Sequence, residues 1–206
     1  MRTDFFIGKR KKEIIKEAEK LGFEQVYFVK IVSKPEEIKR EEKKSYDCVL
    51  LKTNSEDELR KMIDRAFSFS YKVLVLGTTD KVNRIALENK KVFALVSPEY
   101  ERKNDYLDYR NSGLNHVLCK IATSNNKRII LSFKELLGKK KKEQALIIGR
   151  MIQNIKLCRK YKTSLKIASF ASNINELRSI FDLRSFLFSL GADTMTVKLA
   201  FEFPKL

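Results

Sequence analysis

YDCVLLKTNSEDELRKMIDRAFSFSYKVLVLG, residues 46–77, is the part of the sequence that indicates the fold class most clearly. It places two apolar runs, residues 46–53 and 72–77, on either side of a helical pattern. Ser55 is a suitable N-cap for that helix, whose apolar face recurs at helical spacing in Leu59, Met62, Ile63 and Ala66. Strands buried on both faces read as nearly continuous apolar runs. This segment therefore predicts a strand–helix–strand unit of a parallel sheet covered by helices on its outside.

The same alternation extends along the chain. A helical segment ends before Gly22, a residue type favoured just after a helix, and further strands are expected at residues 3–8, 25–32, 92–97, 128–133 and 165–170. Seven strands favour a TIM-barrel-like (β/α) barrel, irregular because 206 residues is short for eight complete units. An open doubly wound sheet is the alternative, although no glycine-rich phosphate loop follows a strand.

The chain is expected to form a single α/β barrel domain over residues 1–206. The segment KPEEIKREEKK, residues 34–44, is so rich in charge that we expect it to be a solvated excursion from that domain.

The charge balance indicates the kind of partner. The chain has 43 Lys and Arg against 26 Asp and Glu, a formal net charge of +17. Such an excess repels itself unless a polyanion balances it, so nucleic acid is the first expected partner and an anionic membrane surface the second. There is neither a bilayer-length apolar run nor a signal peptide pattern, so a cytoplasmic protein without a membrane is expected. Cys48, Cys119 and Cys158 have no metal-site spacing and are expected to be reduced core thiols.

The single histidine, His116, lies in YRNSGLNHVLCKIATSNNKRIILSF, residues 109–133. Ser112 is a suitable N-cap for a helix whose stripe toward the sheet is Leu114, Val117, Leu118, Ile121 and Ala122. His116 and Lys120 would then face solvent or a partner, one turn apart. One imidazole cannot build a multi-histidine metal centre, and no GxSxG elbow accompanies it. No catalytic residue and no metal ligand is therefore expected.

Three motifs resemble ribonuclease P protein component three, the archaeal counterpart of the thirty-kilodalton eukaryotic RNase P subunit. They are YRNSGLNHVLCKIA at 109–122, ILSFKELL at 130–137 and DLRSFLFSLG at 182–191. The resemblance extends from Tyr106 to the end of the chain, whereas the first hundred residues share only the strand–helix rhythm. Cys119 departs mildly, since the family usually has a small residue such as Ala there.

The resemblance implies a barrel-like α/β fold and an RNA-binding role in the ribonucleoprotein that removes 5′ leaders from precursor tRNA. In that endoribonuclease the RNA subunit uses Mg²⁺ for the chemistry, and the isolated chain would be neither catalytic nor the holder of a cofactor. The implied partners are RNase P RNA, precursor tRNA, other RNase P proteins and protein component two, as a heterodimer or a dimer of heterodimers. A stand-alone barrel phosphoesterase acting on an anionic substrate is the alternative function.

The first candidate RNA-binding group is Arg110, Asn115 and His116, carried over from the family motif, with Lys120 added from helix geometry. Asn115 could instead cap the junction before the helix. The second group lies at the two ends of a long helix with an expected buried stripe of Ile148, Met151, Ile152 and Ile155. Its members are Lys139 and Lys140 at the start, and Arg159 and Lys160 at the end, where cations also complement the helix dipole.

The third candidate group comprises Arg178, Arg184 and Lys198. Asp182 is expected to be the N-cap of a helix over residues 183–190, with Gly191 directly after it. Arg178 and Arg184 could serve a local salt bridge with Glu176 or Asp182 instead of contacting RNA. For every group the expected action is neutralisation of phosphates with release of counterions.

Overall fold

Seven parallel strands form one sheet in the order β1-β2-β3-β4-β5-β6-β7. The computed structural model describes residues 1–101, 104–105 and 107–204, so Tyr106, where the resemblance begins, lies outside the described residues. The strands are β1 (Thr3–Ile7), β2 (Gln25–Val32), β3 (Cys48–Leu51), β4 (Lys72–Leu76), β5 (Val92–Val96), β6 (Arg128–Ser132) and β7 (Ser164–Ala168). Each lies within two residues of its predicted run, because both faces of every strand are covered by apolar side chains.

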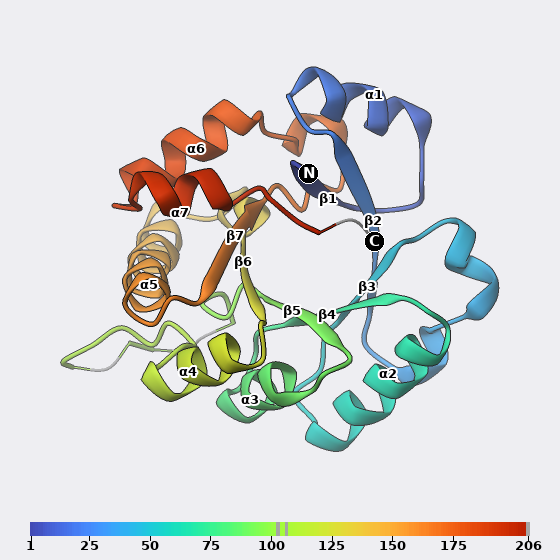
Figure 1. Ribbon diagram of the computed structural model, residues 1–206, viewed down its shortest axis with the longest axis horizontal. Helices are drawn as coiled ribbons and strands as arrows, with labels where there is room; N and C mark the ends of the chain where they lie inside the picture. Colours follow the sequence, from blue (N-terminus) through green and yellow to red (C-terminus); the bar gives the residue numbers. More distant parts are fainter. Residues whose placement is uncertain (102–103, 106, 205–206) are drawn as a thin grey trace.

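The helices surround the strands on the outside (Figure 1). They are α1 (Lys12–Lys20), α2 (Glu56–Ser68), α3 (Asp80–Glu88), α4 (His116–Ser124), α5 (Lys141–Lys160), α6 (Ile180–Ser189) and α7 (Thr194–Leu199). A doubly wound sheet would reverse its strand order at a switch point, whereas this order is sequential throughout. The predicted TIM-barrel-like fold is confirmed, and the doubly wound alternative is wrong.

The barrel is nearly closed between β1 and β7. Ile7 N donates to Ala171 O at 2.7 Å, and Ser169 N donates to Asp4 Oδ1 at 2.7 Å. The segment after α7 also joins the two strands, because Ile167 N donates to Ala200 O and Thr3 N donates to Phe201 O. The C-terminal segment thus supplies part of the closure that an eighth strand would provide.

Two apolar clusters divide the side chains of each strand. In β1, Phe5 belongs to the cluster inside the barrel and Phe6 to the cluster between strands and helices. The interior is filled by rings: the Phe5 centroid lies 5.5 Å from that of Tyr27 and 5.2 Å from those of Phe170 and Phe203. The barrel is therefore a packed core rather than a channel. Cys48, Cys119 and Cys158 are buried and free.

The N-caps of two helices differ from the prediction, whereas the N-cap of α2 and the glycines that follow α1 and α6 agree with it. Asn115, not Ser112, caps α4, because the chain is still turning at Gly113, whose φ is +76°. Ser179, not Asp182, caps α6; the two side chains form a capping box in which Asp182 is the third helical residue. Gly22 and Gly191 follow α1 and α6 with positive φ, as predicted. Ser55 caps α2 through Glu58 N, also as predicted.

The charged segment 34–44 forms two 3₁₀ turns, Pro35–Glu37 and Arg40–Lys44. Most of its charged side chains are exposed, but Ile38 is fully buried in the main core. Ile38 O accepts a hydrogen bond from Arg65 Nε of α2 at 3.0 Å. Ile38 therefore anchors the segment to the barrel, although the composition of the segment is mostly charged.

Among the described residues, no helix has both the length and the apolar character needed to cross a bilayer.

The buried carboxyl of Asp4 at the β1–β7 junction predicts a pH-dependent cost in stability. Burial raises the pKa of Asp4 from 3.8 to about 6, against smaller opposing effects of hydrogen bonds from Ser169. The folded state therefore binds the proton more tightly than the unfolded state. Its stability falls as pH rises from about 4 to 6, and the full penalty of roughly 3 kcal/mol remains above that range.

Asp4→Asn retains an acceptor for Ser169 N and removes the buried charge. The unfolding free energy of the variant minus that of the wild type should therefore be roughly 1 kcal/mol larger at pH 8 than at pH 5. Urea unfolding at the two pH values measures this gain. A difference between variant and wild type that does not change with pH would contradict the assignment.

Candidate nucleic-acid interface

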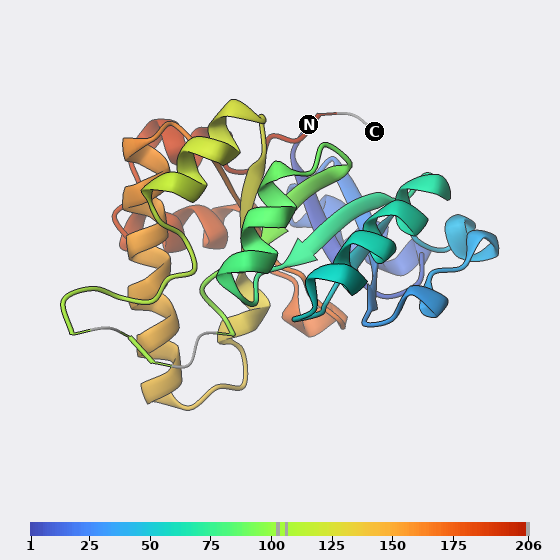
Figure 2. The ribbon, with the colours of Figure 1, turned by 90° about the horizontal axis from the view of Figure 1, so that it is seen from below.

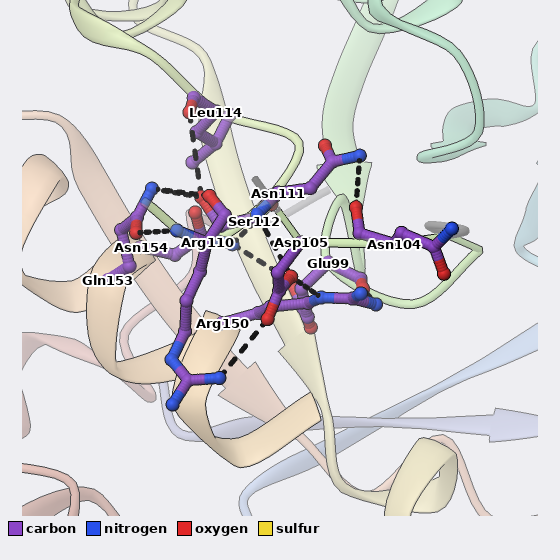
Figure 3. Close-up of polar contacts among 10 residues, drawn as sticks. All are labelled: Glu99, Asn104, Asp105, Arg110, Asn111, Ser112, Leu114, Arg150, Gln153 and Asn154. Atoms are coloured by element: carbon purple, nitrogen blue, oxygen red, sulfur yellow. Dashed lines mark hydrogen bonds and ion pairs between the residues drawn. The ribbon is translucent and has the colours of Figure 1, made fainter. Parts of the chain in front are cut away.

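The loop from β5 to α4, residues 97–115, carries the first predicted binding group. It lies beyond the carboxyl end of β5 and crosses the long helix α5 (Figure 2). Loops at this end of a parallel barrel usually carry its functional residues. The position of the loop against α5 is fixed by polar side chains of that helix, which are shown in Figure 3.

A buried ion pair lies at the centre of this contact. Arg150 of α5 is only 3% exposed, and its Nε lies 2.7 Å from Asp105 Oδ1. Its Nη1 also points toward Glu99 O at 3.5 Å. A buried guanidinium is costly unless carboxylate and carbonyl oxygens surround it. The loop must therefore fold down onto α5 and bring Asp105 with it.

Two amides of α5 add hydrogen bonds on either side of that pair. Asn154 Nδ2 donates to Glu99 Oε2 and to Ser112 O, each at 3.0 Å. Gln153 is bonded to the backbone of Arg110 in both directions: Nε2 donates to Arg110 O at 2.9 Å, and Oε1 accepts from Arg110 N at 3.2 Å. The backbone at Arg110 is therefore fixed relative to the helix.

The Arg110 side chain lies flat against α5. Its Nη1 is 3.1 Å from Asp105 Oδ2, so Asp105 bridges Arg110 and Arg150. A Cβ atom added to Gly149 would lie only 2.5 Å from Arg110 Cζ, so the guanidinium occupies the space that any other residue would fill. Arg110 remains 47% exposed at its side chain and can present its remaining N–H groups outward.

The Asp105 carboxylate stays charged in this setting. Burial by itself would raise the pKa of Asp105, but the hydrogen bonds from Arg150, Asn111 and Arg110 together outweigh it and hold the pKa below its usual value. The Asp105 carboxylate is thus shared by two guanidinium groups.

His116 and Lys120 are exposed on α4, as predicted. Asn115 Oδ1 accepts from Leu118 N at 2.9 Å, so this residue caps the helix. Asn115 also lines a cavity of about 320 Å³ with Lys81 and Arg84 of α3, two cations absent from the candidate groups. The predicted apolar stripe is rotated, since Val117 is 42% exposed while Cys119 is buried.

Lys139 lies near the Arg150 cluster. Its Nζ is 5.0 Å from the centroid of the Tyr100 ring, and both residues line a cavity of about 330 Å³ together with Arg150. A hydrogen bond with Tyr100 raises the pKa of Lys139 above its ordinary value. Lys140 is the exposed residue directly before α5. The structure thus brings Arg110 and Lys139 to the same helix, α5.

The remaining candidates lie elsewhere. Arg159 and Lys160 end α5 at the opposite, amino-terminal end of the barrel strands. Arg178 donates from Nη1 to Asn175 O and Leu177 O and lies 5.3 Å from the centroid of the Phe133 ring.

Arg184 packs on Phe201, and Lys198 is exposed in the last turn of α7. Among the described residues, neither Arg178 nor Arg184 has an ion pair with Glu176 or Asp182, which accept from Ser172 and Ser179 instead.

Four residues of α5 that fix the interface were missed from the sequence: Gly149, Arg150, Gln153 and Asn154. The predicted stripe followed Ile148 and Ile152, which are half-buried, whereas the buried face runs through Ile147, Met151 and Ile155 together with Arg150 and Asn154. The sequence did contain one signal, Gly149 in the middle of a long helix. A glycine there lowers helix stability by about 1 kcal/mol relative to Ala, so its presence indicates that something packs closely against that position.

The arrangement offers hydrogen-bond donors and positive charge rather than a reactive group. Within the described ranges, no cluster of three or more His, Cys, Asp or Glu side chains could hold a metal ion. Exposed guanidinium, imidazole and ammonium groups on a rigid frame are suited to binding phosphate oxygens.

Comparison with known proteins identifies a family. The profile of the family RNase P subunit p30 matches residues 4–204. The ribonuclease P protein component 3 of Methanocaldococcus jannaschii is 33% identical over 147 residues, covering 71% of this chain and 60% of the relative. The protein of that name from Methanococcus maripaludis is 31% identical over 144 residues, covering 70% and 59%. The aligned region thus spans about 60% of the length of these curated relatives.

Solved structures agree in fold. A chain in the cryo-EM structure of archaeal ribonuclease P with mature tRNA superposes with a TM-score of 0.77 at 28% identity, covering 96% of this chain and 86% of that one. A Xaa-Pro dipeptidase is similar with a TM-score of 0.61 at 8% identity, covering 98% and 62%. The second likeness concerns the fold alone.

Gly149→Ala tests whether the position of Arg110 matters for RNA binding. The new methyl group displaces the guanidinium, and we expect RNA affinity to fall roughly tenfold, the value of one charge-assisted hydrogen bond. The helix itself should gain up to about 1 kcal/mol, because Ala is the better helix former. Fluorescence anisotropy with labelled RNA and thermal melting measure the two effects.

The matched control is Ala145→Gly, at an exposed position one turn earlier in α5. It should lower stability and leave RNA affinity unchanged. If Gly149→Ala binds RNA as tightly as the wild type, the position of Arg110 against α5 does not contribute to RNA binding.

Proposed function

This chain belongs to the RNase P subunit p30 family, and from that premise we propose that it is an RNA-binding, non-catalytic protein subunit of ribonuclease P. In this role it stabilises the folded catalytic RNA, whose own Mg²⁺-dependent chemistry removes 5′ leaders from precursor tRNA. The proposal is supported by relatives named ribonuclease P protein component 3 and by the likeness to a chain of archaeal ribonuclease P with mature tRNA.

The observation that carries the proposal is the rigid presentation of Arg110. Its backbone is held by Gln153, its guanidinium rests on Gly149, and about half of its side chain stays open to solvent. Such preorganisation matters because a free arginine loses rotamer entropy when it binds a phosphate. His116 adds an exposed imidazole six residues further along the chain.

The physical action is the neutralisation of phosphates. A folded RNA packs phosphates against one another, and their repulsion opposes folding. Each Lys or Arg placed on a phosphate releases condensed counterions, so the protein can replace part of the Mg²⁺ that the RNA would otherwise need. A formal net charge of +17 is sufficient for many such contacts.

The proposed partners are RNase P RNA, precursor tRNA, protein component two and other RNase P proteins. The assembly with component two would be a heterodimer or a dimer of heterodimers. A stand-alone phosphoesterase is less well supported, because the described residues offer a donor-rich surface in place of a clustered set of metal ligands.

Reconstitution tests the proposal. The RNase P RNA is combined with component two and this chain, and cleavage of precursor tRNA is followed across a magnesium titration. Arg110→Ala and His116→Ala should each raise the magnesium concentration needed for half-maximal cleavage, because each removes a phosphate contact worth about 1.5 kcal/mol.

Lys61→Ala, at an exposed position of α2, is the matched control and should behave as the wild type. Cleavage by the purified chain in the absence of RNA, or a magnesium requirement that does not change when the wild-type protein is added, would contradict the proposed role.

A further inference from the structure

A basic pocket lies at the other end of the barrel, away from the loop 97–115. It has a volume of about 690 Å³ and is formed mainly by residues at or just before the starts of β3, β4, β5 and β6. Its basic lining consists of Lys43, Lys72, Lys90, Lys91, Lys127 and Arg128, while Asp47 is the one carboxylate among the residues that line it. None of these cations belongs to the interface described above.

Lys72 and Arg128 converge on one aromatic ring in this pocket. Lys72 Nζ lies 3.9 Å from the centroid of the Phe93 ring, and Arg128 Cζ lies 4.4 Å from the same centroid. Within the part of the chain that the structure describes, neither cation has an ion pair with a carboxylate. The ring attracts both cations, but it carries no net charge that could neutralise them.

The acidic groups nearby are already engaged. Asp47 is paired with Arg10 and accepts from Phe28 N, and Lys91 is paired with Asp64 at 2.8 Å. The positive charge of Lys72 and Arg128 is therefore left for a group from outside the chain.

The surroundings of these cations are unfavourable for positive charge. Burial lowers the pKa of Lys72 to about 8, and the charges of Arg128 and Lys43 act in the same direction. Burial also lowers the pKa of Arg128. Lys166, on the next strand, has its pKa lowered to about 8 by burial and by the charge of Arg128. A bound anion would relieve this repulsion and raise the pKa values of the lysines toward their ordinary value.

The pocket is the first of three adjoining cavities. A cavity of about 240 Å³ shares Asn126, Lys127 and Arg128 with it. A cavity of about 420 Å³ shares Lys162 and Ser164 with the second and is also lined by Arg159 and Lys166. The charged lining of this row is mainly basic, with Asp193 as a carboxylate in the third cavity. The row is longer than one small anion requires, and it suits successive phosphates of a polynucleotide.

We propose that this row of cavities at the amino-terminal ends of β4 to β7 binds the phosphate backbone of an RNA strand, with Lys72 and Arg128 as the central contacts. The inference rests on the proposed function and deepens it, because it gives the chain a second RNA contact on the face opposite Arg110. Arg128 supplies a fork for two phosphate oxygens and Lys72 a point charge, so the contact reads no base sequence. Arg159, at the far end of the row, becomes part of this second contact.

The test uses the full chain and fluorescein-labelled RNase P RNA at 150 mM KCl, with anisotropy as the readout. Lys72→Gln combined with Arg128→Gln should weaken binding by about tenfold or more, because two phosphate contacts are lost. The matched control, Lys12→Gln combined with Lys16→Gln, removes the same charge from exposed positions of α1 and should change affinity less than twofold. Circular dichroism checks that both variants fold.

If the pocket variant does not fold, acetic anhydride labelling of the wild type decides the question. Lys72 should be labelled less in the RNA complex than in the free chain, whereas equal labelling would overturn the inference.

Equal losses in the pocket variant and the control would also overturn it. A third result would overturn it too: inorganic phosphate binds in the pocket, but the pocket variant binds RNA as tightly as the wild type. The pocket would then be a small-anion site. In each of these cases the proposed function stands if the wild type still lowers the magnesium requirement of the RNA. If the wild type does not bind the RNA, both proposals fail together.

Discussion

The pair formed by Arg150 and Asp105 is the interaction on which the interface depends. A guanidinium buried on the inner face of α5 needs a carboxylate partner, and the nearest segment able to supply one is the loop after β5. Once Asp105 is in place, its second oxygen holds Arg110, and Gly149 leaves room for that side chain to lie flat. These contacts fix the described residues Asp105 and Arg110 of this loop against α5. The buried polar network around Arg150 and Asp105 thereby fixes the position of Arg110 at the surface.

The two ends of the barrel carry positive charge in different ways. At the carboxyl end, Arg110 is held by a shared carboxylate and remains partly exposed. At the amino end, Lys72 and Arg128 are half-buried around Phe93 without an ion pair to a carboxylate among the described residues. In barrel enzymes the amino end usually serves stability. A protein whose role is to hold a polymer can instead bind phosphates at both ends, since a folded RNA is large enough to contact both.

The strands were predictable from the sequence because burial on both faces leaves a continuous apolar run, as in Lys72–Leu76. The caps were less predictable, since Ser179 and Asp182 bond reciprocally and each side chain meets the requirements of an N-cap when seen alone. The buried face of α5 was misplaced because it contains Arg150 and Asn154, which a search for apolar periodicity passes over. The basic pocket could not be predicted, because its cations come from four segments far apart in sequence and each resembles an ordinary charged strand flank.

We propose above that this chain binds folded RNA as a preorganised cationic frame. The most direct test is the dissociation constant of the wild-type chain for RNase P RNA, measured from 50 to 400 mM KCl. We expect the logarithm of the affinity to fall linearly with the logarithm of salt concentration, with a slope of about −0.9 for each phosphate neutralised in a duplex region and several such contacts in total. An affinity that stays constant over this range would show that the chain does not bind RNA through phosphate neutralisation.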